Sequence, residues 1–124
     1  MIADSSFLVA LFLDGDVNHA TALSMSLENA KEDIIIIDRV LEETFTVLAY
    51  KEGVGFALEC AKKIISNQRT VLYRLEGDEE ARIFELAGKI SKKLSYVDYS
   101  IIYLARKHNH RVLTFDRQLS ALVG

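Results

Sequence analysis

The stretch IIIID at residues 34–38 decides the fold class of this chain. Four consecutive isoleucines are typical of a strand buried on both faces, as at the centre of a parallel sheet covered by helices. Residues 39–51 follow directly, and Leu41, Phe45 and Leu48 recur there at the i, i+4 and i+7 spacing of a helix. A buried strand that leads into an amphipathic helix predicts an α/β fold with a central parallel sheet.

The same alternation of strand and helix extends over the rest of the chain. Apolar segments predict further strands at 1–3, 70–75 and 111–115. Helical periodicity predicts helices at 7–13, 18–30, 39–51, 55–65, 79–94 and 97–107. The sequence contains no proline, and it shows no repeat, low-complexity tract or linker. We therefore expect residues 1–124 to form one domain, because this length suits a single core.

The composition excludes several classes of protein. No apolar stretch approaches the ~20 residues of a membrane span. The N-terminus lacks the basic region and apolar segment of a secretory signal, so we expect a soluble, cytoplasmic protein without membrane contact. Cys60 is the only cysteine, which excludes an intramolecular disulfide and a cysteine-based zinc site. We interpret Cys60 as a small buried apolar residue.

The net charge of −3 conceals an asymmetry between the two halves of the chain. Residues 1–61 carry 3 Lys and Arg against 11 Asp and Glu, whereas residues 62–124 carry 12 against 7. The overall charge argues against a protein that grips nucleic acid through general basicity. An acidic site flanked by a basic surface would produce this asymmetry, and so would ordinary solvated helix faces.

Acidic residues follow three of the predicted strands. Asp4, Asp38 and Asp116 occupy these positions, and Glu43 and Asp98 lie near the starts of predicted helices. In an open parallel sheet, ligands bind outside the carboxyl ends of the strands. We therefore expect several carboxylates at one edge of the sheet.

Each acid also has a simpler interpretation as a helix cap or as a partner of a helix dipole. For any one of them alone, capping is the more common role. Several carboxylates at one edge would repel one another, however, and would raise their own pKa values unless a cation neutralised them. Oxygen ligands suit Mg²⁺ or Mn²⁺, and no cluster of histidine and cysteine suggests zinc. A divalent cation held by carboxylates is suited to the hydrolysis of a phosphodiester.

The three histidines occur in no spacing that requires a catalytic role. We interpret His19, His108 and His110 as surface residues, with His108 and His110 available for minor phosphate contacts.

Four segments occur in an order and spacing that identify a family. They are IADSSFL at 2–8, VLEETFTVL at 40–48, LSYVD at 94–98 and VLTFD at 112–116. Together they resemble the PIN-domain family, and especially the short prokaryotic toxins of the VapBC type. The resemblance implies a three-layer α/β/α sandwich and a metal-dependent endoribonuclease that cleaves single-stranded or structured RNA.

The resemblance also assigns roles to individual residues. Asp4, Glu43, Asp98 and Asp116 match the four family acids, which implies that they are catalytic and hold Mg²⁺ or Mn²⁺. The hydroxyls of Ser5, Ser6 and Thr114 match supporting positions, where they would orient the carboxylates. Glu42 and Glu43 are about 100° apart around a helix, so only one of them faces the site, and the helix register favours Glu43.

Further expectations follow from the VapBC resemblance. We expect the toxin of a type II toxin–antitoxin pair, a homodimer, and a cognate antitoxin. The antitoxin would lay an apolar helix into a groove near the first helices and insert a basic side chain into the acidic site. Many family members continue into another strand after the fourth acid, so we expect a different sheet border where this sequence ends at Gly124.

Other functions would use a similar sheet edge. A haloacid dehalogenase type of phosphoryl-transfer enzyme needs a second Asp two residues after the first, and Ser6 stands there. A phosphoacceptor receiver domain needs paired acids near the first strand and a lysine after the last, and neither is in place. A catalytically silent PIN-like module that binds RNA or protein, and a nuclease of RNA maturation, are the remaining alternatives.

Overall fold

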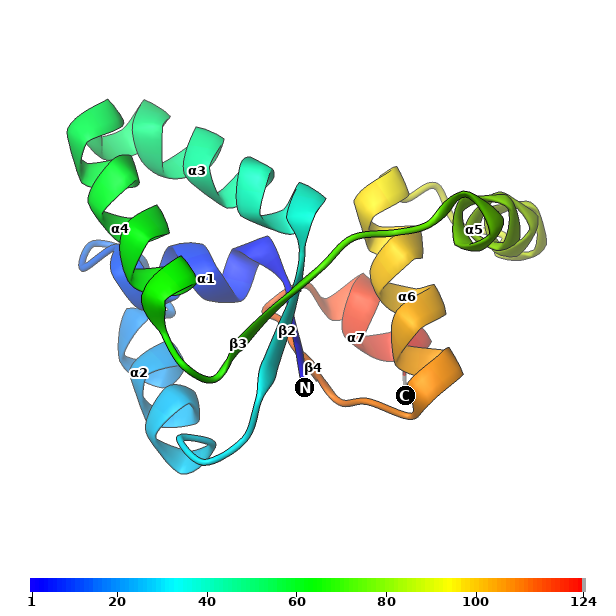
Figure 1. Cartoon of the computed structure of the whole chain (residues 1–124), viewed down its shortest axis with the longest axis horizontal. Helices are drawn as coiled ribbons and strands as arrows, with labels where there is room; N and C mark the ends of the chain where they lie inside the picture. Colours follow the sequence, from blue (N-terminus) through cyan, green and yellow to red (C-terminus); the bar gives the residue numbers. More distant parts are fainter. Residues whose placement is uncertain (124) are drawn as a thin grey trace.

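The computed structural model describes residues 1–123, which form a four-stranded sheet between two layers of helices (Figure 1). The helices α1 to α4 lie on one side of the sheet and α5 to α7 lie on the other. This arrangement is the α/β/α sandwich that the sequence predicts. In chain order the elements are β1 (Ile2–Ala3), α1 (Ser5–Phe12), α2 (His19–Glu28), β2 (Ile34–Ile37), α3 (Asp38–Glu52), α4 (Val54–Ser66), β3 (Thr70–Tyr73), α5 (Gly77–Lys89), α6 (Tyr96–His108), β4 (Val112–Leu113) and α7 (Arg117–Val123).

The strand order is β3-β2-β1-β4, and all pairs are parallel. Ile2 is in register with both Ile35 and Val112, so β1 lies between β2 and β4. The chain first builds the sheet from β1 toward β3 and then returns to place β4 on the other side of β1. Ligands of open parallel sheets bind where the strand order reverses, at the carboxyl ends of the strands. In this sheet that position lies between the carboxyl ends of β1 and β4.

The isoleucine strand is buried along only half of its length. Ile36 and Ile37 are 2% and 0% exposed, whereas Ile34 and Ile35 are partly exposed. Ile34 lines an open groove, which accounts for its partial exposure. The expectation of a strand buried on both faces therefore holds for its second half. Behind it, the core is formed by apolar residues of both helical layers, including Phe7, Leu8, Val40, Ile101, Ile102 and Leu104.

The predicted helices and strands are present, with shifted ends. The strand predicted at 70–75 stops at Tyr73, and β4 contains only Val112 and Leu113. The helix predicted at 79–94 ends at Lys89. Within residues 1–123 no strand follows β4, which is an edge of the sheet, and α7 comes after it.

The predictions from composition can be compared with the structure at two points. Among residues 1–123, no helix is both long and apolar enough to cross a membrane. Cys60 is buried at 3% exposure between apolar neighbours, as expected. Burial raises the pKa of its thiol.

Candidate active site

The carboxylate of Asp4 lies at the carboxyl end of β1 and is 5% exposed. Asp4 is also the N-cap of α1, and its Oδ1 accepts a hydrogen bond from the Ser5 backbone N–H at 2.8 Å. Its Oδ2 accepts from the hydroxyls of Ser6 and Thr114, both at 2.8 Å. A buried charge is costly unless hydrogen bonds satisfy it, and three donors do so here. They also fix the direction of the carboxylate.

The hydroxyls of Ser6 and Thr114 tie the start of α1 to the end of β4. The two oxygens are 3.2 Å apart. The backbone N–H of Phe115 donates to Ser6 Oγ at 3.0 Å, and that of Asp116 donates to Thr114 Oγ1 at 3.0 Å. These bonds hold the segment that leads into Asp116 against the start of α1, at the point where the strand order reverses.

Asp98 lies in the first turn of α6, where it forms a capping box with Ser95. The Asp98 N–H donates to Ser95 Oγ at 3.1 Å, and the Ser95 N–H donates to Asp98 Oδ2 at 3.3 Å. Burial raises the pKa of the Asp98 carboxyl, and the negative charges of Asp4 and Asp116 raise it further, against the hydrogen bonds from Ser95. Asp98 is therefore close enough to Asp4 and Asp116 for their charges to affect it.

Glu43 lies in the second turn of α3 and accepts a hydrogen bond from the hydroxyl of Ser5. This contact turns Glu43 toward the start of α1. Glu42 and Glu43 are both exposed, and neither makes an ion pair among residues 1–123, but only Glu43 has a hydrogen bond to α1. Asp38, at the end of β2, accepts from the Arg39 N–H at 2.9 Å and makes no hydrogen bond to the four acids.

The sequence matches the profile of the family described as PIN domain over residues 1–124. The chain belongs to the PIN-domain family. PIN domains are nucleases that act on RNA. The fold is similar to the crystal structure of VapC20 of Mycobacterium tuberculosis, a toxin that cleaves the sarcin–ricin loop. The two structures superpose with a TM-score of 0.85, over 97% of this chain and 92% of VapC20, and their sequences are 24% identical. None of the curated proteins matches this PIN domain in sequence.

The acids of this PIN domain act as helix caps as well as neighbours of one another. Asp4 caps α1, Asp98 caps α6, and Asp116 Oδ1 accepts from the N–H groups of Gln118 and Leu119 at 2.9 and 3.2 Å, in the first turn of α7. Asp4, Asp98 and Asp116 thus take part in helix capping, whereas Asp38 does not cap α3, whose N-cap is Ile37. That the four acids form one site stays a prediction.

The donor set fits a hard divalent cation in its chemistry. Carboxylate oxygens are the ligands that Mg²⁺ and Mn²⁺ prefer. Burial raises the pKa of Asp98, and the charges of Asp4 and Asp116, which a cation would offset, add to this. Within residues 1–123, no three His, Cys, Asp or Glu side chains are close enough together to form a ready metal cluster. Asp98 and Asp116 each have one carboxylate oxygen that makes no hydrogen bond among residues 1–123 and would be available to a cation.

The expectation of surface histidines is confirmed for His108, which is exposed, whereas His19 and His110 are partly buried. His19 is not a free surface side chain, because its Nδ1–H donates to the Ala10 carbonyl at 2.7 Å and its Nε2 lies 3.4 Å from Asp14. His108 and His110 lie at the end of α6 and just before β4, which is the amino edge of the sheet. They are on the opposite edge from the acids and cannot contact a phosphate there.

Sequence reasoning missed one charged residue at the acidic edge. Arg39, in the first turn of α3, forms an ion pair with Glu80 of α5, and its guanidinium lies 4.9 Å from the ring centre of Tyr96. Arg39 follows Asp38 directly in the sequence, and this position at the carboxyl end of the predicted strand could have identified it as a residue of the acidic edge. Its partner on α5 could not be read from the sequence.

Proposed function

We propose that this PIN domain is a metal-dependent endoribonuclease with Asp4, Glu43, Asp98 and Asp116 as its catalytic acids. The observation that carries the proposal is the buried Asp4 carboxylate, oriented by Ser6 and Thr114, with Asp98 and Asp116 near enough to affect each other electrostatically. A buried acid with repelling neighbours at the reversal point of a sheet is the expected form of a ligand-binding site. Family membership supplies the substrate class, which is RNA.

The four acids would hold Mg²⁺ or Mn²⁺. Such a cation supplies activation of the attacking water and neutralisation of charge on the phosphate oxygens. The protein's own part is orientation. Ser6 and Thr114 fix Asp4, and the Ser5 hydroxyl fixes Glu43. We therefore assign Ser5, Ser6 and Thr114 to the support of the carboxylates.

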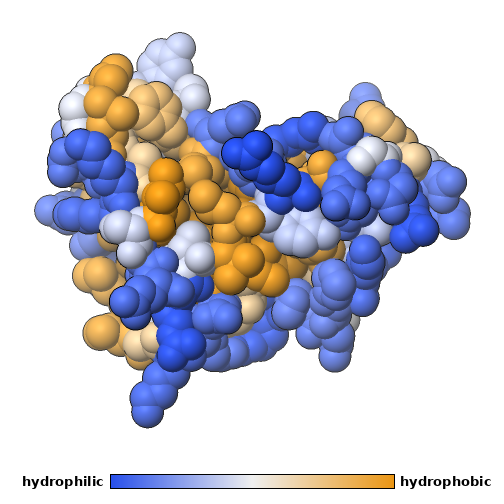
Figure 2. All heavy atoms as spheres, in the orientation of Figure 1, coloured by the Kyte–Doolittle hydropathy of each residue, from blue (hydrophilic) through white to orange (hydrophobic). Residues whose placement is uncertain are grey.

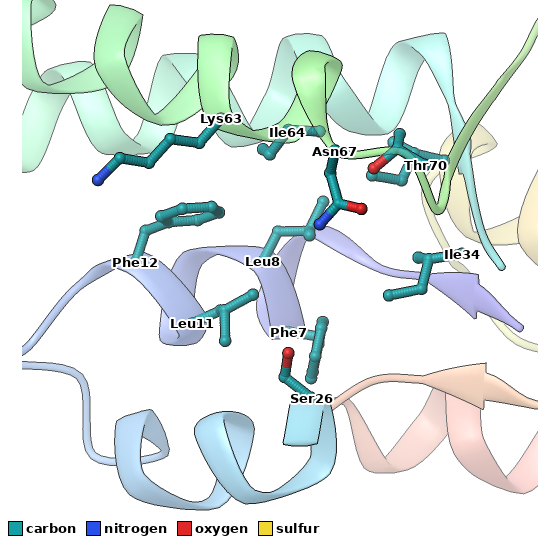
Figure 3. A pocket seen from close by; sticks show the side chains of 11 residues that line it. Phe7, Leu8, Leu11, Phe12, Ser26, Ile34, Lys63, Ile64, Asn67 and Thr70 are labelled. Carbon is teal, nitrogen blue, oxygen red and sulfur yellow. The ribbon is translucent and has the colours of Figure 1, made fainter. Parts of the chain in front are cut away.

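We further propose that the protein is the toxin of a toxin–antitoxin pair. The fold likeness to VapC20, itself a toxin, supports this assignment. A groove of about 230 Å³ offers a place for an antitoxin segment (Figure 3). Apolar side chains of α1 form its floor, and Ser26 of α2 and Ile64 of α4 border it. An amphipathic helix fits an apolar groove of this kind between helices.

The test is cleavage of a short single-stranded RNA in Mn²⁺ and in EDTA. We expect the parent protein to cut only with the metal, and Asp4→Asn to lower the rate by orders of magnitude, because one ligand charge is lost. Asp38→Asn is the matched control, since Asp38 also follows a strand at this edge but is not one of the four proposed acids. We expect it to cut like the parent.

Two outcomes would decide against the proposal. Cleavage that continues in EDTA would remove the metal mechanism. A parent protein that binds the RNA but never cuts it would favour the alternative of a catalytically silent PIN module.

A further inference from the structure

An exposed aromatic ring lies beside the start of α6. Phe84, on α5, is 65% exposed, and its ring centre is 5.1 Å from that of Tyr96, with the two planes tilted by 45°. The guanidinium of Arg39 lies 4.9 Å from the centre of the same tyrosine ring. Tyr96 therefore contacts both a cation and a second ring, whereas most of Phe84 faces solvent.

This aromatic array adjoins the acidic edge. Tyr96 is the first residue of α6, two residues before Asp98, and Arg39 lies in the first turn of α3. Figure 1 shows that α3 and α6 begin at the same edge of the sheet and that α5 lies beyond α6. The array thus leads outward from the acids, from Arg39 through Tyr96 to Phe84.

The connection between α5 and α6 adds positive charge on this side of the molecule. Lys92 and Lys93 are exposed and make no ion pair among residues 1–123. The connection is held against α6 because Tyr99 donates its hydroxyl to the Lys92 carbonyl at 2.6 Å and accepts from the Leu94 N–H at 3.2 Å. These lysines are consequently anchored next to the turn that contains Asp98, where they are placed to contact phosphate groups.

We propose that Phe84 stacks a base of the single-stranded RNA, next to the bond that the acids cleave. This inference rests on the proposed nuclease function and assigns part of its substrate site. An exposed ring near unpaired cations is the usual combination for binding single strands, because stacking accepts any base and the cations follow the backbone. Tyr96 and Arg39 support the ring from behind and link its position to that of Asp98. A protein partner could also pack against the exposed Phe84 ring. Only RNA accounts for the ring together with the neighbouring acids and lysines.

The test measures binding and cleavage separately. Short single-stranded RNAs with 2-aminopurine at successive positions are titrated in EDTA, and their cleavage is then measured in Mn²⁺. We expect one position to report stacking in the parent protein, and Phe84→Ala to abolish that signal and weaken binding about tenfold, within the range for one stacked base. KM should rise by a similar factor while kcat changes little. Phe84→Tyr keeps a ring and should restore both the signal and KM.

Tyr50→Ala is the matched control, because Tyr50 is an aromatic residue 88% exposed near the end of α3 that lies away from the acids. We expect it to behave like the parent. Unchanged binding and KM in Phe84→Ala would overturn the stacking site and leave the nuclease proposal intact. If the stacking signal depends on Phe84 but the RNA is never cleaved, the stacking site stands and the nuclease proposal fails. A change of solution mass in Phe84→Ala, with RNA binding unchanged, would show instead that the ring contacts protein.

Discussion

At the scale of single residues, the site is built from side chains that serve two purposes. Asp116 is the clearest case, since one oxygen caps α7 while its charge contributes to the repulsion that Asp98 experiences. From the sequence, capping and metal binding are alternative roles for such an acid. The structure shows why position and residue type alone could not separate them, because a strand end that leads into a helix start satisfies both.

The two roles of Asp116 can be separated by a pair of substitutions. Asp116→Asn keeps an oxygen that can cap α7, so we expect its metal-free stability to stay near that of the parent. Asp116→Ala loses the cap and should lower the free energy of unfolding by about 1 kcal/mol. Both should lose RNA cleavage in Mn²⁺, because both lose the carboxylate charge.

Thermal unfolding in EDTA measures the first property, and the cleavage assay measures the second. If Asp116→Asn still cuts RNA at the parental rate, Asp116 is a cap only and the ligand set must be redrawn.

At the scale of elements, a buried cluster joins β3, α5 and α6. Glu79 is 4% exposed and accepts hydrogen bonds from the Tyr73 hydroxyl at 2.9 and 2.7 Å on its two oxygens. Lys107 of α6 lies 3.5 Å from Glu79 Oε2. Burial and the hydrogen bond to Glu79 raise the pKa of Tyr73 to about 12, so its hydroxyl remains a donor. The cluster anchors the helices that present Asp98 and Phe84.

This cluster makes stability depend on pH in the acid range. Burial alone would raise the pKa of the Glu79 carboxyl, but hydrogen bonds from Tyr73 and the Glu76 N–H, together with Lys107, lower it below its ordinary value. A lowered pKa in the folded protein means that the unfolded chain takes up the proton first as pH falls. Glu79 therefore contributes stability above about pH 4.3, and this contribution is lost as pH falls through the folded pKa.

Urea unfolding between neutral pH and about pH 3 checks this expectation. Glu79→Gln should be less stable than the parent at neutral pH and should lose less of its stability on acidification. Glu80→Gln is a control on the adjacent residue, since Glu80 pairs with Arg39 and is more exposed. If the free energy of unfolding of Glu79→Gln falls as steeply with decreasing pH as that of the parent, other carboxyl groups cause the pH dependence.

The ends of the helices and strands show which parts of the fold could be predicted from the sequence. The isoleucine strand and the helix after it were predictable, because period and β-branching are local properties. The start of α5 was missed by two residues, since its capping box pairs Glu76 with Glu79, a local signal that was present. Its end was missed by five residues because the Tyr99 hydroxyl holds the connection, and a contact with the next helix leaves no periodic signature. Asp4 and Asp116 could be placed at strand ends from local sequence, and Glu43 and Asp98 were assigned from the family resemblance. The ion pair of Arg39 with Glu80 joins two helices and has no local signal.

At the scale of the whole molecule, one face of the protein exposes several large apolar side chains to solvent. Figure 2 shows apolar residues gathered on the face that β3 crosses. Val71 and Leu72 of this edge strand are 41% and 44% exposed, and Ile65 at the end of α4 is 56% exposed. Exposed edge strands and contiguous apolar patches are typical of interfaces.

We expect a homodimer that uses this face. Light scattering should give about twice the monomer mass of 14.0 kDa, and Leu72→Glu should return it to the monomer value, because a buried unpaired charge opposes association. Leu27→Glu, at an exposed position on α2, is the control and should leave the mass unchanged. A parent protein that stays at 14.0 kDa across micromolar concentrations would exclude this dimer.

The shared contact of Ser6 and Thr114 with Asp4 has a consequence for the synthesis of the protein. The two residues are 108 positions apart, and Asp4 obtains its third donor only when β4 has paired with β1. Nearly the whole chain must therefore leave the ribosome before the carboxylate is oriented, and contacts of such long range form late in folding. A chain released before β4 has the acids of its first half but not the arrangement that holds them. The oriented carboxylate is thus a property of a chain that includes β4, and shorter translation products lack it.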